Sequence, residues 1–175
     1  MKQIFVIVLL FFYCKSYGQF DTTLKYTEVI QVDSMNKLTL YQRARAWTND
    51  AFKSSKNVIQ IDDKETGEIA GKAIYDATIS WNALGKRTAT TTVNFKFQIL
   101  VKDGRYKYIF TDFTEEGYYG YLLTSAKENP NTTKSVSKKN LDMIWDSLKE
   151  STEYKMTGLI NSLKKAMQSK SDTDF

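Results

Sequence analysis

Two long stretches of alternating apolar and polar residues limit the fold more than any other feature of the sequence. Residues 68–81 and 87–101 carry apolar side chains at every second position, which is the period of a β-strand with one buried face. Residues 105–113 repeat the pattern, and short polar turns containing Gly85 and Gly104 separate the three stretches. Turns this short join antiparallel neighbours. The chain must therefore contain an antiparallel meander of three long strands.

The alternation also assigns side chains to the two faces of the predicted sheet. We expect the buried face to carry Ile69, Gly71, Ala73, Tyr75, Ala77, Ile79, Trp81, Val93, Phe95, Phe97, Ile99, Val101, Tyr106, Tyr108 and Phe110. We expect the opposite face to be polar and to carry, among others, Lys72, Asp76, Thr78, Ser80, Thr92, Asn94, Lys96 and Gln98.

The remaining elements complete an α+β domain. Strand patterns occupy residues 24–32 and 57–61, and apolar residues recur at helical spacing over 37–53 and 138–168. Either Asn36 or Ser34 is suited to cap the first helix. The order β-α-β-β-β-β-α predicts a mostly antiparallel sheet of four to five strands with two helices on one face.

Residues 1–18 have the pattern of a signal peptide. A basic start precedes an apolar run, Ile4–Tyr13, and small residues at Ser16 and Gly18 predict cleavage before Gln19. The run is shorter than the roughly 20 residues of a membrane span. We therefore expect export to the periplasm or the exterior and no membrane span. Lipidation at Cys14 is the alternative, disfavoured by the bulky pair of residues before it.

Composition excludes several kinds of site. The chain has no histidine, and its one cysteine, Cys14, lies within the predicted signal, so Cys–His catalysis, zinc sites and disulfides are excluded from the exported chain. No phosphate-binding glycine motif is present. We expect no catalytic residue, no metal and no cofactor. The net charge of +5 for the full chain falls when Lys2 and Lys15 leave with the signal, and does not indicate nucleic-acid binding.

Carboxylates are the remaining candidates for chemistry. Four of them cluster near one turn, but their spacing does not match a calcium loop, which favours a solvated connection: Asp62, Asp63, Glu65 and Glu68. Glu115 and Glu116 are adjacent on a predicted strand, so their side chains should point to opposite faces rather than converge.

Several segments resemble a known family. These are Tyr26–Ile30, Leu40–Trp47, Phe52–Gln60, Asp63–Lys72 and Lys102–Tyr108. Together they look like a family of exported bacterial proteins described as a domain of unknown function with a TBP-like fold, over about residues 25–115. The resemblance implies a sheet with two helices and implies no activity. A shared architecture does not transfer DNA binding, so no nucleic-acid partner is expected.

Two surfaces are candidates for binding. Lys72, Lys96, Arg105 and Lys107 should form a mildly basic platform on the outer sheet face, unless this is simply a solvated face. Three tyrosines lie in a loop that we expect to be mobile, near residues 114–136: Tyr118, Tyr119 and Tyr121. Such aromatics suit contact with a carbohydrate or protein, and the alternative is that this loop folds down over the core.

The last helix is the third candidate surface. We divide the chain into a core domain at 19–136, a helix at 137–168 and a frayed tail at 169–175. At 1.5 Å per residue the helix is roughly 45 Å long, which is long for a domain of this size. Its distal half, Met156–Met167, either packs against a second copy or another protein, or the helix bends near Gly158 and stays on its own core.

These features favour an exported, non-enzymatic binding or interaction module. Its expected ligand is an envelope glycan, peptide or protein, held at the open polar sheet face. One alternative is a hydrolase that uses Asp63 with Glu65 or Glu115. Another is a self-assembling structural protein that forms a homodimer through the last helix.

Overall fold

The computed structural model is an α+β domain with seven elements in the predicted order. It describes residues 23–52, 58–117, 120–126, 129–130 and 135–168, so the predicted signal and tail lie outside the described residues. The elements are β1 (Tyr26–Gln31), α1 (Lys37–Ala51), β2 (Ile59–Asp63), β3 (Glu68–Asn82), β4 (Lys86–Lys102), β5 (Arg105–Glu115) and α2 (Lys138–Gln168).

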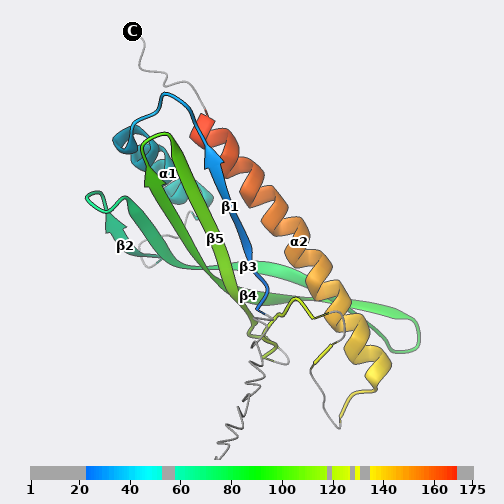
Figure 1. Cartoon of the computed structure of the whole chain (residues 1–175). Coiled ribbons are helices and arrows are strands. Elements are labelled where there is room, and N and C mark those ends of the chain that lie inside the picture. The colour runs from blue at the N-terminus through cyan, green and yellow to red at the C-terminus, as the bar shows by residue number, and fades with distance from the viewer. Residues whose placement is uncertain (1–22, 53–57, 118–119, 127–128, 131–134, 169–175) are drawn as a thin grey trace, which may run out of the picture.

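The five strands form one antiparallel sheet in the order β1-β5-β4-β3-β2. The predicted meander is β3-β4-β5. Strand β3 pairs with β4 without interruption, from Glu68 opposite Leu100 to Asn82 opposite Lys86. Both helices lie on the same face of the sheet, and the β3–β4 hairpin extends beyond the other strands as an arm (Figure 1). Within the described ranges, no helix has the length and apolar character needed to cross a lipid bilayer.

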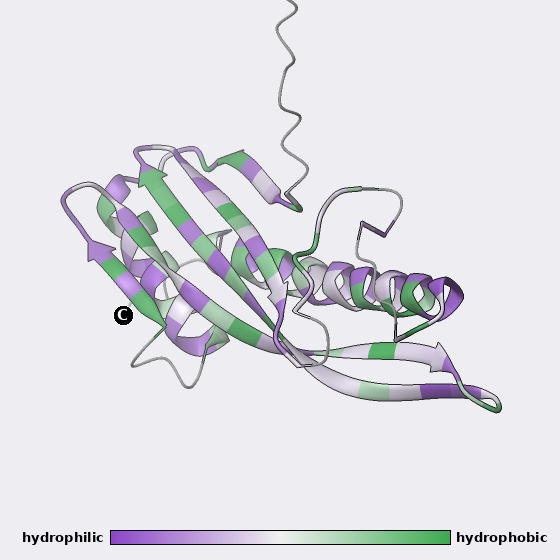
Figure 2. Ribbon diagram, turned by 90° about the horizontal axis from the view of Figure 1, so that it is seen from below, coloured by the Kyte–Doolittle hydropathy of each residue, from purple (hydrophilic) through white to green (hydrophobic). Residues whose placement is uncertain are grey.

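The core lies between the sheet and the helices. Every side chain assigned above to the buried face is buried except Trp81, which is half-buried and packs against the core. Phe95 lies at the centre, stacked on Phe113 with 5.6 Å between ring centroids. The alternation appears as green and purple bands along the strands in Figure 2. Burial of this aromatic-rich face is the main stabilising contribution, because apolar area removed from water contributes roughly 25 cal/mol per Å².

The first helix begins where the sequence predicts. Asn36 is the N-cap, and its Oδ1 accepts a hydrogen bond from the backbone N–H of Thr39 at 2.8 Å. The helix buries Leu40, Tyr41, Ala44, Trp47 and Thr48. Trp47 is also tied to α2, because its Nε1 donates to Ser162 Oγ at 2.9 Å.

A β-bulge changes the side-chain alternation of β5. Asp112 has a φ of 58°, and the pairing with β4 shifts between Asn94 and Lys96. The extra residue moves odd-numbered side chains to the inner face, so Phe113 and Glu115 are buried after Phe110. Strand β5 therefore continues to Glu115, two residues beyond the predicted end.

Helix α2 is one continuous helix that does not end at Gly158. Its distal half buries Met156, Leu163 and Met167 within this chain. The distal half thus stays on its own core without the bend that we expected to be necessary. The apolar stripe that motivated a homodimer is already covered.

The same helix covers the edge of β3 that extends past β2. Backbone N–H groups of Thr78, Ser80 and Asn82 donate to side-chain oxygens of α2 at 2.9–3.1 Å, and the acceptors are Ser151 Oγ, Ser147 Oγ and Asn140 Oδ1. An unpaired strand edge is a template for aggregation, so these three contacts protect the arm.

The segment after β5 folds back over the core. Bridges join Thr114 to Leu122 and Thr23 to Thr124, and the Leu123 N–H donates to Phe113 O at 2.8 Å. Leu123 is fully buried. Residues 120–124 thus pack against the core, which is the arrangement that the alternative interpretation of this segment describes.

Candidate functional site

The outer face of the sheet is the bare surface of the domain. Because α1 and α2 both pack on the inner face, no helix among the described residues covers the other side (Figure 1). Apolar side chains are also exposed there: Ile74 is 65% exposed and Val29 53% exposed. Several hollows open on this face, and two of them contain the lysines and the arginine that the sequence predicts.

The first hollow lies at the β4–β5 hairpin and is here called the basic hollow. It has a volume of about 300 Å³ and is lined by Val29, Leu100, Lys102, Arg105, Tyr106 and Lys107. Lys102 is the direct cross-strand partner of Arg105. Lys107 lies two residues along β5 on the same face, between Leu100 of β4 and Val29 of β1. The register thus gathers three cations around two apolar side chains.

The three cations of the basic hollow are not neutralised within the part of the chain that the structure describes. None of them forms an ion pair with another described residue. The nearest carboxylate in sequence, Asp103, accepts a hydrogen bond from the Lys37 backbone N–H at 2.7 Å, toward the start of α1. Like charges directly opposite each other across two strands repel. An anion in the hollow would relieve that repulsion.

The second hollow lies in the middle of the sheet and is here called the balanced hollow. Its volume is about 490 Å³, and its lining side chains include Lys72, Lys96, Asp112, Glu116 and Leu122. Lys96 Nζ lies 2.7 Å from an Asp112 carboxylate oxygen. Two cations and two anions share this rim, so it has no net attraction for an anion.

The predicted basic platform is therefore two separate sites. Arg105 and Lys107 belong to the basic hollow, whereas Lys72 and Lys96 belong to the balanced hollow. Lys107 pairs with Leu100 of β4, which lies four residues from Lys96. The two lysines are therefore about 13 Å apart along the strands, at 3.3 Å per residue. Lys102 completes the basic hollow and was missed, although its even position in β4 matches that of Lys96.

Of the three tyrosines predicted to contact a ligand, Tyr121 is the one that falls within the described residues. Tyr118 and Tyr119 lie outside the described residues. Tyr121 is only 5% exposed, and its ring meets Trp145 edge-on with 6.4 Å between centroids. Tyr121 is thus a core residue, which corrects its assignment as a ligand contact.

Glu115 and Glu116 point to opposite sides, as predicted. Glu116 is exposed, whereas Glu115 is only 1% exposed. Its carboxylate accepts hydrogen bonds from the Thr91 hydroxyl and from the backbone N–H groups of Gly117 and Gly120, the latter two at 2.8 and 2.9 Å. Glu115 therefore holds the loop that follows β5.

The acidic cluster near β2 has structural contacts. Asp62 accepts hydrogen bonds from the Tyr41 hydroxyl and Arg45 Nε, and these bonds lower the pKa of its carboxyl. Asp63 Oδ1 accepts from the backbone N–H groups of Glu65 and Thr66 at 2.8 and 3.1 Å, and hydrogen bonds from Thr66 and Glu65 likewise lower its pKa. Across the described residues, no three acidic side chains are placed to hold a metal ion.

Asp63 and Glu115, one of the two pairs named for a hydrolase, do not converge on a cleft. Asp63 is level with Leu100 of β4, because both pair with Glu68, whereas Glu115 pairs with Val93. Seven residues along β4 separate these levels, about 23 Å at 3.3 Å per residue. Glycosidase carboxylates lie only about 5–9.5 Å apart.

Comparison with known proteins identifies the fold and the family. The structure is similar to a DUF4468 family protein from Bacteroides ovatus, with 16% identity and a TM-score of 0.62 over 87% of this chain and 90% of that one. It is also similar to a TBP-like protein from Parabacteroides distasonis, with 14% identity and a TM-score of 0.53 over 82% and 94%. Such identities show the fold alone.

A search among curated proteins finds no match. The family described as a domain of unknown function (DUF4468) with TBP-like fold matches residues 26–116, from the first residue of β1 to one residue beyond β5. The match covers the whole sheet and α1, and the chain therefore belongs to this family.

Proposed function

We propose that this chain is an exported, non-enzymatic binding module that takes an anionic group of an envelope glycan or peptide in the basic hollow. The observation that carries this proposal is the group of three cations, Lys102, Arg105 and Lys107, on a bare sheet face without ion pairs among the described residues. The repulsion among them is a cost that a bound carboxylate or phosphate would offset.

The neighbours of these cations suit recognition better than general attraction. The planar guanidinium of Arg105 can bind a carboxylate or phosphate with two parallel hydrogen bonds. Val29 and Leu100 offer apolar contact beside the charges, which would favour a ligand with an apolar face next to its anion. The site therefore supports orientation of a ligand rather than its chemical conversion.

The binding test uses two acidic probes, an oligogalacturonide and an oligoglutamate peptide, with neutral dextran as the control ligand. Titration calorimetry at low salt should show binding of at least one acidic probe and none of dextran. R105Q/K107Q should weaken that binding by at least about tenfold, because charge-assisted hydrogen bonds contribute about 1.5–3 kcal/mol each. Added salt should weaken it further.

K72Q is the matched control, because Lys72 is an exposed lysine on the same face in the balanced hollow. It should leave the affinity unchanged, and urea unfolding should show that all variants are folded. The probe that binds more tightly shows whether the ligand is a glycan or a peptide. Failure of both acidic probes at millimolar concentration, or an equal loss in K72Q, would refute the proposal.

The proposal of export has its own test. Expression in a bacterial host should place the chain outside the cytoplasm, and N-terminal sequencing should begin at Gln19. A chain that stays in the cytoplasm with Met1 at its N-terminus would contradict export without affecting the binding test.

A further inference from the structure

The end of the β3–β4 arm presents an apolar side chain to solvent. The hairpin tip, residues 83–87, carries Leu84, which is fully exposed and has a φ of 53°. This left-handed conformation favours Asn or Gly and is costly for a bulky side chain. Leu84 therefore stabilises nothing within the described chain, and a partner outside the chain would explain its position.

The hairpin tip is held firmly in place. Asn82 N–H donates to Asn140 Oδ1 and Asn140 Nδ2 donates back to Asn82 O, both at 3.0 Å. Trp81, just before this pair, packs against the core. These contacts fix the tip beside the start of α2, and Figures 1 and 2 show the arm reaching that end of the helix. Leu84 is thus displayed on a rigid support.

Three cations lie close to this apolar point along the chain or through the contact between Asn82 and Asn140. Lys86 and Arg87 follow Leu84 on the returning strand, and Lys139 precedes Asn140 at the start of α2. All three are exposed, and within the described ranges none of them forms an ion pair. Lys138 differs, because its Nζ lies 3.2 Å from an Asp142 oxygen. The tip therefore combines one protruding apolar side chain with three uncompensated positive charges.

We infer that the hairpin tip docks on an anionic lipid surface. Leu84 enters the interface between headgroups and acyl chains, and Lys86, Arg87 and Lys139 face the lipid phosphates. Charge complementarity favours this occupant, since anionic lipids attract clustered Lys and Arg near the membrane surface. The tip is convex and carries one apolar side chain. A convex shape can rest on a broad surface, whereas a concave pocket could not.

This inference is independent of the proposed binding function. The basic hollow lies at the other end of β4, sixteen residues from Lys86, or roughly 50 Å of strand at 3.3 Å per residue. A protein that binds no acidic glycan or peptide can still dock on lipid, and the converse also holds. The two ends of β4 can therefore be tested with separate variants.

The test is co-sedimentation with phosphatidylcholine vesicles that contain or lack phosphatidylglycerol. All elements of the fold lie between residues 23 and 168, so the chain from Gln19 onward carries the whole domain and excludes the apolar run. This chain should bind the anionic vesicles only. L84A should weaken partitioning by about tenfold through lost apolar burial, and K86Q/R87Q by about 30-fold through two lost charges.

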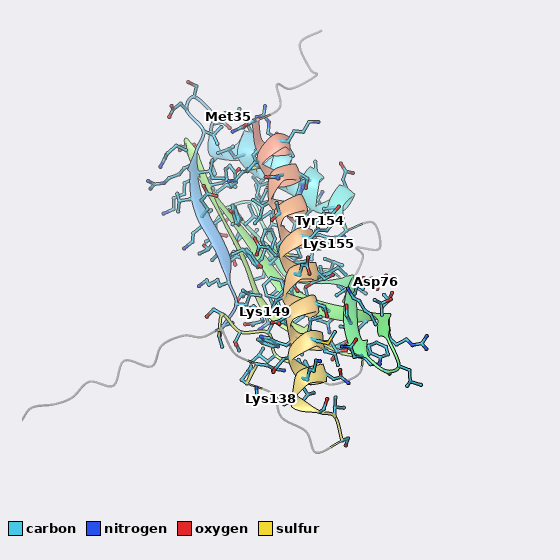
Figure 3. All side chains as sticks on the ribbon, turned by 90° about the vertical axis from the view of Figure 1, so that its right-hand side faces the viewer. Met35, Asp76, Lys138, Lys149, Tyr154 and Lys155 are labelled. Atoms are coloured by element: carbon cyan, nitrogen blue, oxygen red, sulfur yellow. The ribbon has the colours of Figure 1, made fainter. Side chains whose placement is uncertain are left out.

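Two further variants locate the contact. Y154S/K155Q removes an exposed aromatic and a lysine from the outward face of α2 (Figure 3) and should leave vesicle binding unchanged. L84W should gain a blue-shifted emission component on anionic vesicles that the wild-type chain lacks. R105Q/K107Q should lose less vesicle binding than K86Q/R87Q does.

Each opposite result overturns the inference. No binding to anionic vesicles excludes the lipid surface as the occupant. Binding that survives L84A with an unshifted L84W emission shows that the tip is not in contact, and an equal loss in Y154S/K155Q shows attraction without a site. If the chain binds a soluble acidic protein but does not bind anionic vesicles, the partner of the tip is a protein instead.

Discussion

The inner and outer faces of β3, β4 and β5 differ although they share a backbone. On the inner face, side chains such as Phe95, Phe97 and Phe110 are almost completely buried and contact one another and the helices. On the outer face, Lys72, Ile74 and other side chains are exposed. An ion pair there determines which lysines have a neighbouring carboxylate that compensates their charge. The difference indicates that stability and recognition reside on opposite faces, so each can be changed with little effect on the other.

The largest expected effect is loss of a central inner-face ring. F95A should lower the free energy of unfolding by about 3–5 kcal/mol, because it removes a buried phenyl ring and leaves a cavity. Its outer-face neighbour offers the control: N94A should change stability by less than about 0.5 kcal/mol. Urea unfolding measures both. Equal losses in the two variants would show that the outer face is also structural, and would end the distinction.

The next effect concerns Glu115, a buried carboxylate on the inner face. E115A should destabilise the fold by about 2–3 kcal/mol, because the buried Thr91 hydroxyl and the N–H groups of Gly117 and Gly120 lose a charged acceptor. The adjacent E116A is the control and should have little effect, since Glu116 is exposed. If E116A proves the more damaging in thermal unfolding, the assignment of the two faces beyond the bulge is wrong.

Glu115 also shows where prediction from the sequence succeeds and where it ends. Strict alternation predicts the inner-face residues of β3 and β4, because a period of two leaves one assignment that buries the apolar set. The bulge at Asp112 depends on a left-handed φ at one residue, which the alternation of apolar residues does not encode. Only the apolar residue Phe113, out of step with Phe110, hints that the alternation shifts.

The candidate site was predicted in part for the same reason. Arg105 and Lys107 follow from alternation in β5, and Lys102 could have been added from its parity in β4. The neutralisation of Lys96 was not predictable, because Asp112 reaches it only through the bulge. Likewise, Ser147 and Ser151 are ordinary polar helix residues until the edge of β3 is placed beside them.

Buried tyrosines make the stability of the inner face depend on alkaline pH. Burial raises the pKa of Tyr75 and Tyr106 to about 12 in the folded protein, from about 10 in the unfolded chain. Their contribution to stability is therefore complete below pH 10 and is lost as the pH rises from 10 to about 12. Chemical unfolding at a series of pH values should show this decline, and N94A should show the same slope.

Two phenylalanine substitutions sharpen this prediction. Y75F should cost about 1 kcal/mol at neutral pH, because the Tyr75 hydroxyl donates to Thr152 Oγ1 at 2.6 Å. Y106F should be neutral or stabilising, since the buried Tyr106 hydroxyl has no hydrogen-bond partner among the described residues. Both should flatten the alkaline decline. An unchanged slope in both variants would assign the decline to other groups.

The smallest expected effect concerns an ion pair on the outer face. It tests whether a short distance between two exposed charges is enough to stabilise the fold. Lys96 and Asp112 are 2.7 Å apart, but their side chains are 54% and 43% exposed, so the pair should contribute about 0.2–1 kcal/mol and less in high salt. Lys72 lies directly opposite Lys96, and K96Q also relieves the repulsion between them. These opposing terms place K96Q near zero and make K72Q neutral or slightly stabilising. A double-mutant cycle of K96Q with D112N isolates the pair, and a coupling energy comparable to the loss in E115A would show that the outer face stabilises the fold as the inner face does.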